Sequence, residues 1–232
     1  MFTGSILALF SLILLSGCDR SPQTYYPLKA GMSWEYSFSG GPLLVARHEY
    51  IEKGVNKVNN FTKRNLKGQD VIPQKIETLF IFRHQTPKMI TSYEFIMQDS
   101  SGIYSYAHQN DTDYEPTIYQ NRRCILKYPI KIGTKWLTKA DCTDGNEITL
   151  ESLIESINDT ITVPSGNFSN CIKIKSKGFK KIDQGLLLVT NYEWLAPNVG
   201  TVKSISNEQV TKKGETVFEG EIICSLSTFH NK

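Results

Sequence analysis

Apolar and polar residues alternate along most of the chain, in runs that end at Gly, Pro, Asn or Asp. In the clearest run, Trp34, Tyr36 and Phe38 share one parity, and a Gly-Gly-Pro sequence follows. This period of two is typical of β-strands that bury one face. The same pattern predicts strands over the segments 43–51, 76–82, 95–97, 103–106, 168–174, 186–194, 202–205 and 217–226.

In the segment 148–157, a helix competes with a strand. Apolar residues at positions 150, 153, 154 and 157 fit helical spacing, whereas those at 148, 150 and 154 fit one face of a strand. The β-branched content and the Thr-Ile-Thr-Val-Pro sequence that follows favour a strand. We therefore predict a mainly β fold over residues 25–232, a single domain with a curved antiparallel sheet or half-open barrel and few or no helices.

A nine-residue pattern occurs twice, 102 residues apart. Residues 26–34 and 128–136 carry Tyr, Pro, Lys, Gly and Trp at the same offsets. We expect Pro and Gly to shape a turn in each copy, after which Trp begins a strand and enters the core. The repetition predicts two similar halves, 25–123 and 124–232. The matched turn and core residues are Tyr26, Pro27, Gly31 and Trp34 in one copy and Tyr128, Pro129, Gly133 and Trp136 in the other.

The N-terminus predicts the cellular compartment. Residues 6–15 form an apolar run far shorter than the ~20 residues of a membrane-spanning helix, as in a signal-peptide core. The sequence Leu-Ser-Gly-Cys follows at 15–18 and resembles the lipobox of bacterial lipoproteins, which implies acylation of Cys18 and cleavage before it. We predict a lipoprotein signal peptide over 1–17, a tether over 18–24 and membrane attachment through palmitate-type acylation. An ordinary secretory signal is the alternative.

Asp19 follows the predicted acylation site directly. In enterobacterial lipoproteins, Asp at this position resembles a signal for retention in the inner membrane. The expected location is therefore the cell envelope, facing the periplasm, with the inner membrane slightly favoured over the outer one.

Four cysteines remain once Cys18 is assigned to lipid: Cys124, Cys142, Cys171 and Cys224. An even number in an oxidising compartment predicts two disulfides. No pair has C-x-x-C spacing, which disfavours zinc. We favour Cys124 with Cys142 and Cys171 with Cys224, although Cys171 shares a strand face with lysines whereas Cys224 shares one with apolar residues. Metal ligation is the rival to two disulfides, and a bridge between Cys142 and Cys171 would overturn this choice of pairing.

Composition excludes some classes of function. The chain has 232 residues, of which 40% are hydrophobic, so it can bury a core and is not a disordered tail. A net charge of +3 is too small to indicate nucleic-acid binding. The lysines between positions 173 and 181 would suit anionic lipid headgroups, but the polar face of a strand accounts for them better.

The sequence carries no recognisable catalytic or metal motif. His48, His84, His108 and His230 lie outside any nucleophile or zinc pattern, and no Gly-x-Ser-x-Gly sequence is present. Carboxylates at 111, 113 and 115 alternate as in a calcium loop, but Pro116 stands where an EF-hand loop needs Gly, so a solvated acidic loop is favoured. We assign no cofactor and no metal.

Three motifs together resemble a family of secreted and lipid-anchored bacterial β-proteins of unknown function. They are the Tyr-Pro-Leu-x-x-Gly-x-x-Trp sequence at 26–34, the strand, turn and strand at 162–168 around Gly166, and the turn that enters a strand at 194–203. The last contains Trp194, Pro197 and Gly200. The resemblance implies a fold similar to lipoprotein carriers of the LolA/LolB type, a curved sheet around an apolar interior, and it supplies no catalytic residue.

These observations predict a lipid-anchored envelope protein that binds an apolar ligand or an envelope partner without catalysis. An assembly or structural accessory lipoprotein that acts through protein contacts, by pairing at an exposed sheet edge, is the alternative. A hydrolase is third and requires a buried histidine that contacts both a Ser or Cys and a carboxylate.

Overall fold

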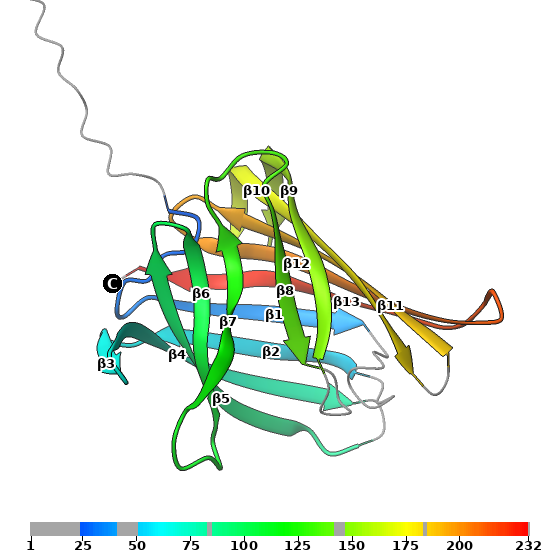
Figure 1. Ribbon diagram of the computed structural model, residues 1–232, viewed down its shortest axis with the longest axis horizontal. Helices are drawn as coiled ribbons and strands as arrows, with labels where there is room; N and C mark the ends of the chain where they lie inside the picture. The colour runs from blue at the N-terminus through cyan, green and yellow to red at the C-terminus, as the bar shows by residue number, and fades with distance from the viewer. Residues whose placement is uncertain (1–23, 41–50, 83–84, 142–146, 183–184, 232) are drawn as a thin grey trace, which may run out of the picture.

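The computed structural model describes residues 24–40, 51–82, 85–141, 147–182 and 185–231. Within these segments the chain forms thirteen β-strands and no helix, which confirms the mainly β prediction (Figure 1). The strands are β1 (Ser33–Gly40), β2 (Ile51–Asn60), β3 (Arg64–Leu66), β4 (Gln69–Phe82), β5 (Lys88–Asp99), β6 (Gly102–Asn110), β7 (Thr117–Lys127), β8 (Lys135–Asp141), β9 (Glu147–Val163), β10 (Gly166–Ile182), β11 (Gly185–Ala196), β12 (Gly200–Lys212) and β13 (Glu215–His230).

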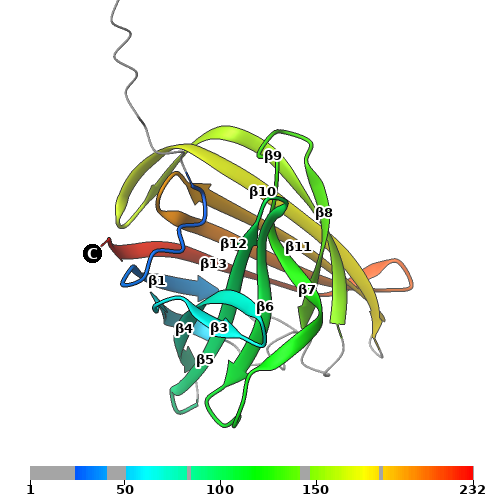
Figure 2. The same ribbon diagram turned by 60° about the vertical axis from the view of Figure 1, so that its left-hand side comes forward.

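The strands form one antiparallel sheet in the order β7-β6-β5-β4-β2-β1-β13-β12-β11-β10-β9-β8, with β3 paired to β4 off this path. Strands β1 to β7 and β8 to β13 are two meanders, joined where β1 pairs with β13. The sheet curves until β7 faces β8, where Thr138 Oγ1 donates to the Cys124 carbonyl at 3.2 Å. This nearly closed barrel (Figures 1 and 2) confirms the predicted curved sheet.

The repeated pattern forms the same turn twice. Gly31 and Gly133 have φ values of 83° and 89°, a left-handed conformation that glycine adopts without a steric penalty. The Gly31 amide donates to the Asn60 carbonyl at 2.9 Å, and the Gly133 amide donates to the Ile154 carbonyl at 3.0 Å. In each copy the partner's amide donates back to the residue after the glycine. The two meanders therefore begin in the same way.

Each copy then places its tryptophan at the second position of a strand. Trp34 on β1 is 6% exposed and packs in a cluster with Val202 and Leu226. Trp136 on β8 is 8% exposed and packs in another cluster with Ile154. The predicted core role of both residues is confirmed.

The observed strands can be compared with those predicted from the sequence. The ambiguous segment 148–157 lies within β9, so the strand was the correct interpretation. The hairpin between β5 and β6 turns at 99–102, where it was expected. Most of the segment 43–51 lies outside the described residues. Strands β2 and β7 were not predicted, because their polar residues conceal the alternation.

The predicted bridge between Cys171 and Cys224 is absent, and both residues are free thiols. In the sheet, β11 and β12 separate β10, which carries Cys171, from β13, which carries Cys224. The Cys171 thiol instead donates to the Phe168 carbonyl at 3.4 Å. Cys124 is also a free, buried thiol, and Cys142 lies outside the described residues.

Candidate functional site

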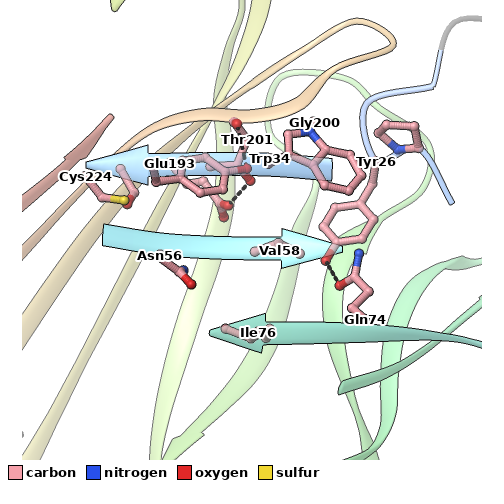
Figure 3. Close-up of a pocket in the computed structure, with 13 residues that line it drawn as sticks. Tyr26, Trp34, Asn56, Val58, Gln74, Ile76, Glu193, Gly200, Thr201 and Cys224 are labelled. Carbon is pink, nitrogen blue, oxygen red and sulfur yellow. Dashed lines mark hydrogen bonds between the residues drawn. The ribbon is translucent and has the colours of Figure 1, made fainter. Parts of the chain in front are cut away.

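Two neighbouring cavities lie against the inner face of the sheet. The small cavity has a volume of about 230 Å³ and the large cavity about 380 Å³. Four residues line both: Tyr26, Gln74, Ile76 and Glu193. The two cavities are therefore neighbouring parts of one site. Figure 3 shows the small cavity, which is also lined by Pro27, Trp34, Tyr36, Asn56, Val58, Gly200, Thr201, Ser204 and Cys224.

The segment before β1 forms part of the wall of both cavities. At one side, the Asn198 amide donates to the Thr24 carbonyl at 2.6 Å, in the turn between β11 and β12. At the other side, the Tyr26 hydroxyl donates to Gln74 Oε1 on β4 at 3.0 Å, and Asn60 Nδ2 donates to the Pro27 carbonyl at 3.2 Å. Residues 24–27 thus connect strands that are distant in the sheet and hold the Tyr26 ring at the boundary between the cavities.

Two of the three sequence motifs meet at this wall. Trp34 Nε1 donates to the Val199 carbonyl at 2.6 Å. Gly200 has a φ of 92°, and a Cβ there would lie 3.4 Å from Pro27 Cδ and 3.9 Å from Trp34 Nε1. The turn after β11 therefore needs glycine for its backbone conformation and brings the chain close to the indole.

Glu193 is the acidic group of the small cavity. It lies on the face of β11 that also carries Leu187, Val189 and Leu195, all of them buried. Its Oε1 accepts a hydrogen bond from Thr201 Oγ1 at 2.6 Å, drawn as a dashed line in Figure 3. No Lys, Arg or His is among the described residues that line this cavity. Burial raises the pKa of the Glu193 carboxyl, because the charged form loses its hydration.

Two other acidic groups share the wall. The Tyr36 hydroxyl donates to the Thr201 carbonyl at 3.1 Å, and burial raises its pKa well above the ordinary value. Burial also raises the pKa of the Cys224 thiol to about 11. Both groups are therefore neutral at physiological pH, and neither supplies a nucleophile.

The large cavity has a second carboxylate on β5. Glu94 accepts hydrogen bonds from Ser105 and, at 3.4 Å, from the Tyr119 hydroxyl. Burial raises the pKa of Glu94, and the hydrogen bond from Ser105 and the charge of Arg123 offset part of this rise. The Arg123 guanidinium lies 3.9 Å from the centre of the Tyr119 ring. In contrast to Glu193, this carboxylate has a cationic neighbour, Arg123.

The opposite wall of the large cavity carries a row of hydroxyl groups. Thr138 and Ser152 are hydrogen-bonded at 3.0 Å, and Ser152 and Ser176 at 2.8 Å. Trp136 stands beside them, and among the described residues its Nε1 has no hydrogen-bond partner. The interior therefore combines apolar and polar surface and is not the apolar interior that the resemblance to lipoprotein carriers implied.

The remaining motif residues have structural roles. Gly166 has a φ of 133° in the turn between β9 and β10, and the Ser165 amide in this turn donates to the Leu226 carbonyl. Trp194 donates to Asp159 at 2.8 Å, and Pro197 lies in the turn after β11. Tyr128 follows β7 and its hydroxyl accepts from Gln98 at 3.0 Å, before a cis peptide bond to Pro129. Cys18 lies outside the described residues.

Lys173 and Lys175 lie on a polar face of β10, the interpretation that the sequence favoured. Lys173 and Lys175 contact Glu155 on β9 at 2.6 Å and 3.2 Å. Both ammonium groups also lie over the Tyr192 ring. Their charges are therefore paired at the surface.

The His108 ring contacts an aromatic side chain. Its ring stacks on Tyr119, with the ring centres 5.0 Å apart, and its Nδ1 has no hydrogen-bond partner among the described residues. Ser105 donates to Glu94. His48 and His84 lie outside the described residues, and His230 is exposed at the end of β13. The described segments thus give no support to a histidine-activated nucleophile.

Sequence reasoning missed the carboxylates of the interior. The sequence analysis did not single out Glu193, because it lies in a mainly apolar strand. It is an even number of residues from Leu187 and Val189, which places it on the same, buried face. A charged residue at such a position is the signal that could have identified it. Glu94 gave a weaker signal, because β5 alternates poorly.

The described segments lack two further features. They contain no group of three or more His, Cys, Asp or Glu side chains that could hold a metal ion. They also contain no helix with the length and apolar character needed to cross a membrane.

Comparison with solved structures finds two of similar shape. One is a "putative lipoprotein" from Parabacteroides distasonis, with 14% sequence identity and a TM-score of 0.42, covering 90% of this chain and 99% of that one. The other is a "putative exported protein with YmcC-like fold" from Bacteroides fragilis, with 13% identity and a TM-score of 0.44, covering 90% of this chain and 100% of that one. No curated protein sequence matches. Residues 154–221, from β9 to β13, match the model of a family described as DUF3108-like.

Proposed function

We propose that this protein is a lipid-anchored component of the bacterial cell envelope that binds a small ligand inside its barrel without catalysis. The observation that carries the proposal is the pair of cavities against the inner face of the sheet. Concave sites of a few hundred Å³ with a few convergent polar groups are typical of small-molecule binding. The sequence at 15–18, which resembles a lipobox, supports the anchor.

The segment that follows the predicted tether also forms part of the site. Cys18 precedes Thr24 by six residues, and Tyr26 lines both cavities. A ligand bound there lies next to the anchored end of the barrel. This placement favours exchange of a ligand with the membrane surface.

The cavity walls restrict the ligand. Val58, Ile76 and Ile96 offer apolar surface, whereas Glu193 and Glu94 would lose hydration beneath a wholly apolar molecule. A ligand with both an apolar and a polar part suits this lining better than the apolar ligand that the sequence suggested.

The accessory role by protein contact receives less support. Edge pairing needs an exposed strand edge, and part of the β7 edge lies against β8, where Thr138 Oγ1 donates to the Cys124 carbonyl.

Two measurements test the proposal. Fractionation of the producing cells should find the full chain in membranes and the Cys18→Ala variant in the soluble fraction, since at ~0.8 kcal/mol per buried methylene two acyl chains anchor a protein durably. Asp19→Ser serves as the matched variant, because it keeps the acylated thiol and should change only the membrane that retains the protein.

Native mass spectrometry of the full chain in non-ionic detergent should then detect a bound small molecule. Equal membrane retention of Cys18→Ala contradicts the anchor, and the absence of any copurified or rebound ligand contradicts the binding role.

A further inference from the structure

The small cavity has a negative group and no compensating positive group. Glu193 accepts one hydrogen bond, from Thr201, and none of the described residues lining the cavity is cationic. A buried carboxylate is costly unless it is paired or protonated. A positively charged ligand would remove this cost, since it would supply the missing counter-charge.

The hydrogen-bond donors on the aromatic residues are already used within the protein. Trp34 donates to the Val199 carbonyl, Tyr36 to the Thr201 carbonyl and Tyr26 to Gln74. Gln74 Nε2 in turn donates to Asn60 Oδ1 at 2.8 Å. These walls consequently offer few donors to an anionic ligand, while the Glu193 carboxylate remains an acceptor for a ligand that donates.

The same three rings supply π surface. Trp34 is 6% and Tyr36 9% exposed, and both line the cavity with Tyr26. Tyr26 and Trp34 are labelled in Figure 3. Aromatic faces attract organic cations, and the attraction is strongest where water is excluded. A carboxylate together with several aromatic rings is the combination that ammonium groups favour.

We propose that the small cavity binds the ammonium group of a small organic amine, primary or quaternary, with Glu193 as its counter-ion and the rings of Tyr26, Trp34 and Tyr36 as its walls. This inference rests on the proposed ligand-binding function and names its ligand class. At about 230 Å³ the small cavity holds only a compact head group, and any apolar extension lies past Ile76 in the large cavity.

The test is calorimetric titration of the purified full chain in non-ionic detergent. Choline is the probe, and 3,3-dimethylbutanol, which has nearly the same shape without the charge, is the matched ligand. Choline should bind, and the neutral analogue should bind at least about tenfold more weakly. Equal affinity for the two molecules, or no choline binding up to roughly 10 mM, overturns the inference.

Matched protein variants separate the local charge from the net charge. Glu193→Gln keeps the side-chain size and should weaken choline binding at least about tenfold. Glu155→Gln removes the same charge from the outer face, where Glu155 contacts Lys173 and Lys175, and should leave the affinity unchanged. Unchanged binding by Glu193→Gln in a protein with a normal melting transition overturns the assignment. If choline fails but a neutral or anionic amphiphile copurifies with the protein, the ligand-binding function stands and the ammonium inference alone is wrong.

Discussion

Trp34 and Trp136 occupy equivalent places in the repeated pattern but differ in one hydrogen bond. Trp34 Nε1 donates to the Val199 carbonyl at 2.6 Å, whereas Trp136 Nε1 has no partner among the described residues. The two side chains are 6% and 8% exposed, so replacing either indole with a phenyl ring removes a similar amount of buried surface. Comparison of Trp34→Phe with Trp136→Phe therefore isolates the contribution of the hydrogen bond.

The magnitudes follow from the two environments. Truncation of the ring should cost on the order of 1 kcal/mol in both variants. Trp34→Phe also leaves the Val199 carbonyl without its donor, which adds about 1–3 kcal/mol. Trp136→Phe instead removes a buried donor that already lacks a partner, which offsets its truncation cost by about 1 kcal/mol. Trp34→Phe should thus be less stable than Trp136→Phe by about 2 kcal/mol or more.

Urea unfolding followed by circular dichroism measures this difference. At a slope near 2 kcal/mol per M, a difference of about 2 kcal/mol separates the two midpoints by roughly 1 M urea. The slopes of the two variants should agree, so that the midpoints can be compared. An equal loss of stability in both variants, or a larger loss in Trp136→Phe, would refute the reasoning.

Three other variants or treatments test separate features of the fold. Burial raises the pKa of the Glu193 carboxyl, so the folded state favours its neutral form. The contribution of this group to folding stability is therefore fully present below the ordinary carboxyl pKa, and it is lost as the pH rises through the pKa of the folded protein. Glu193→Gln should therefore raise the melting temperature at pH 7.5 and not at pH 4, and a shift of equal size at both values would contradict this. Gly54→Ala should unfold the protein or lower its stability by about 3 kcal/mol or more, because the new Cβ would lie 2.1 Å from Phe38 Cζ and 2.4 Å from the Leu79 carbonyl oxygen; a melting temperature like that of the wild type would be inconsistent with this packing. With a pKa near 11, the buried Cys171 thiol should react slowly with iodoacetamide at pH 7.5 in the folded protein and rapidly in urea without reductant, whereas a need for reductant in urea would reveal a disulfide.

The sequence predicted the strands that bury an apolar face. In β1, Trp34, Tyr36 and Phe38 are all buried, as their alternation indicated. The repeated pattern likewise predicted two equivalent turns before two strands, and the left-handed φ of Gly31 and Gly133 confirms them. These features depend on local periodicity and turn chemistry, which a single sequence records.

Strands that line the polar interior were missed for a physical reason. On β2, Asn56 and Val58 both line the small cavity, so the inward face mixes polar with apolar residues and the period of two disappears. On β7, Arg123 and Cys124 both line the large cavity, at positions of opposite parity close to irregular pairing with β6. The residues that depart from the apolar pattern are thus among those that form the site.

The disulfide prediction was wrong for Cys171 with Cys224 because cysteine arithmetic contains no information about strand order. Two intervening strands in the sheet separate β10 from β13, and a sequence without contact information does not reveal that order.

The pairing of β1 with β13 joins Ser33 to His230 across nearly the whole chain. Loop-closure entropy makes such a contact slow to form. We therefore expect β1 and β13 to pair late in folding, after the hairpins of each meander have formed. Until then β1 exposes a row of unpaired amides and carbonyls on one side, and strands of neighbouring copies could pair with it. Peptides that mimic β13 should accordingly bind chains during refolding and leave the folded barrel untouched.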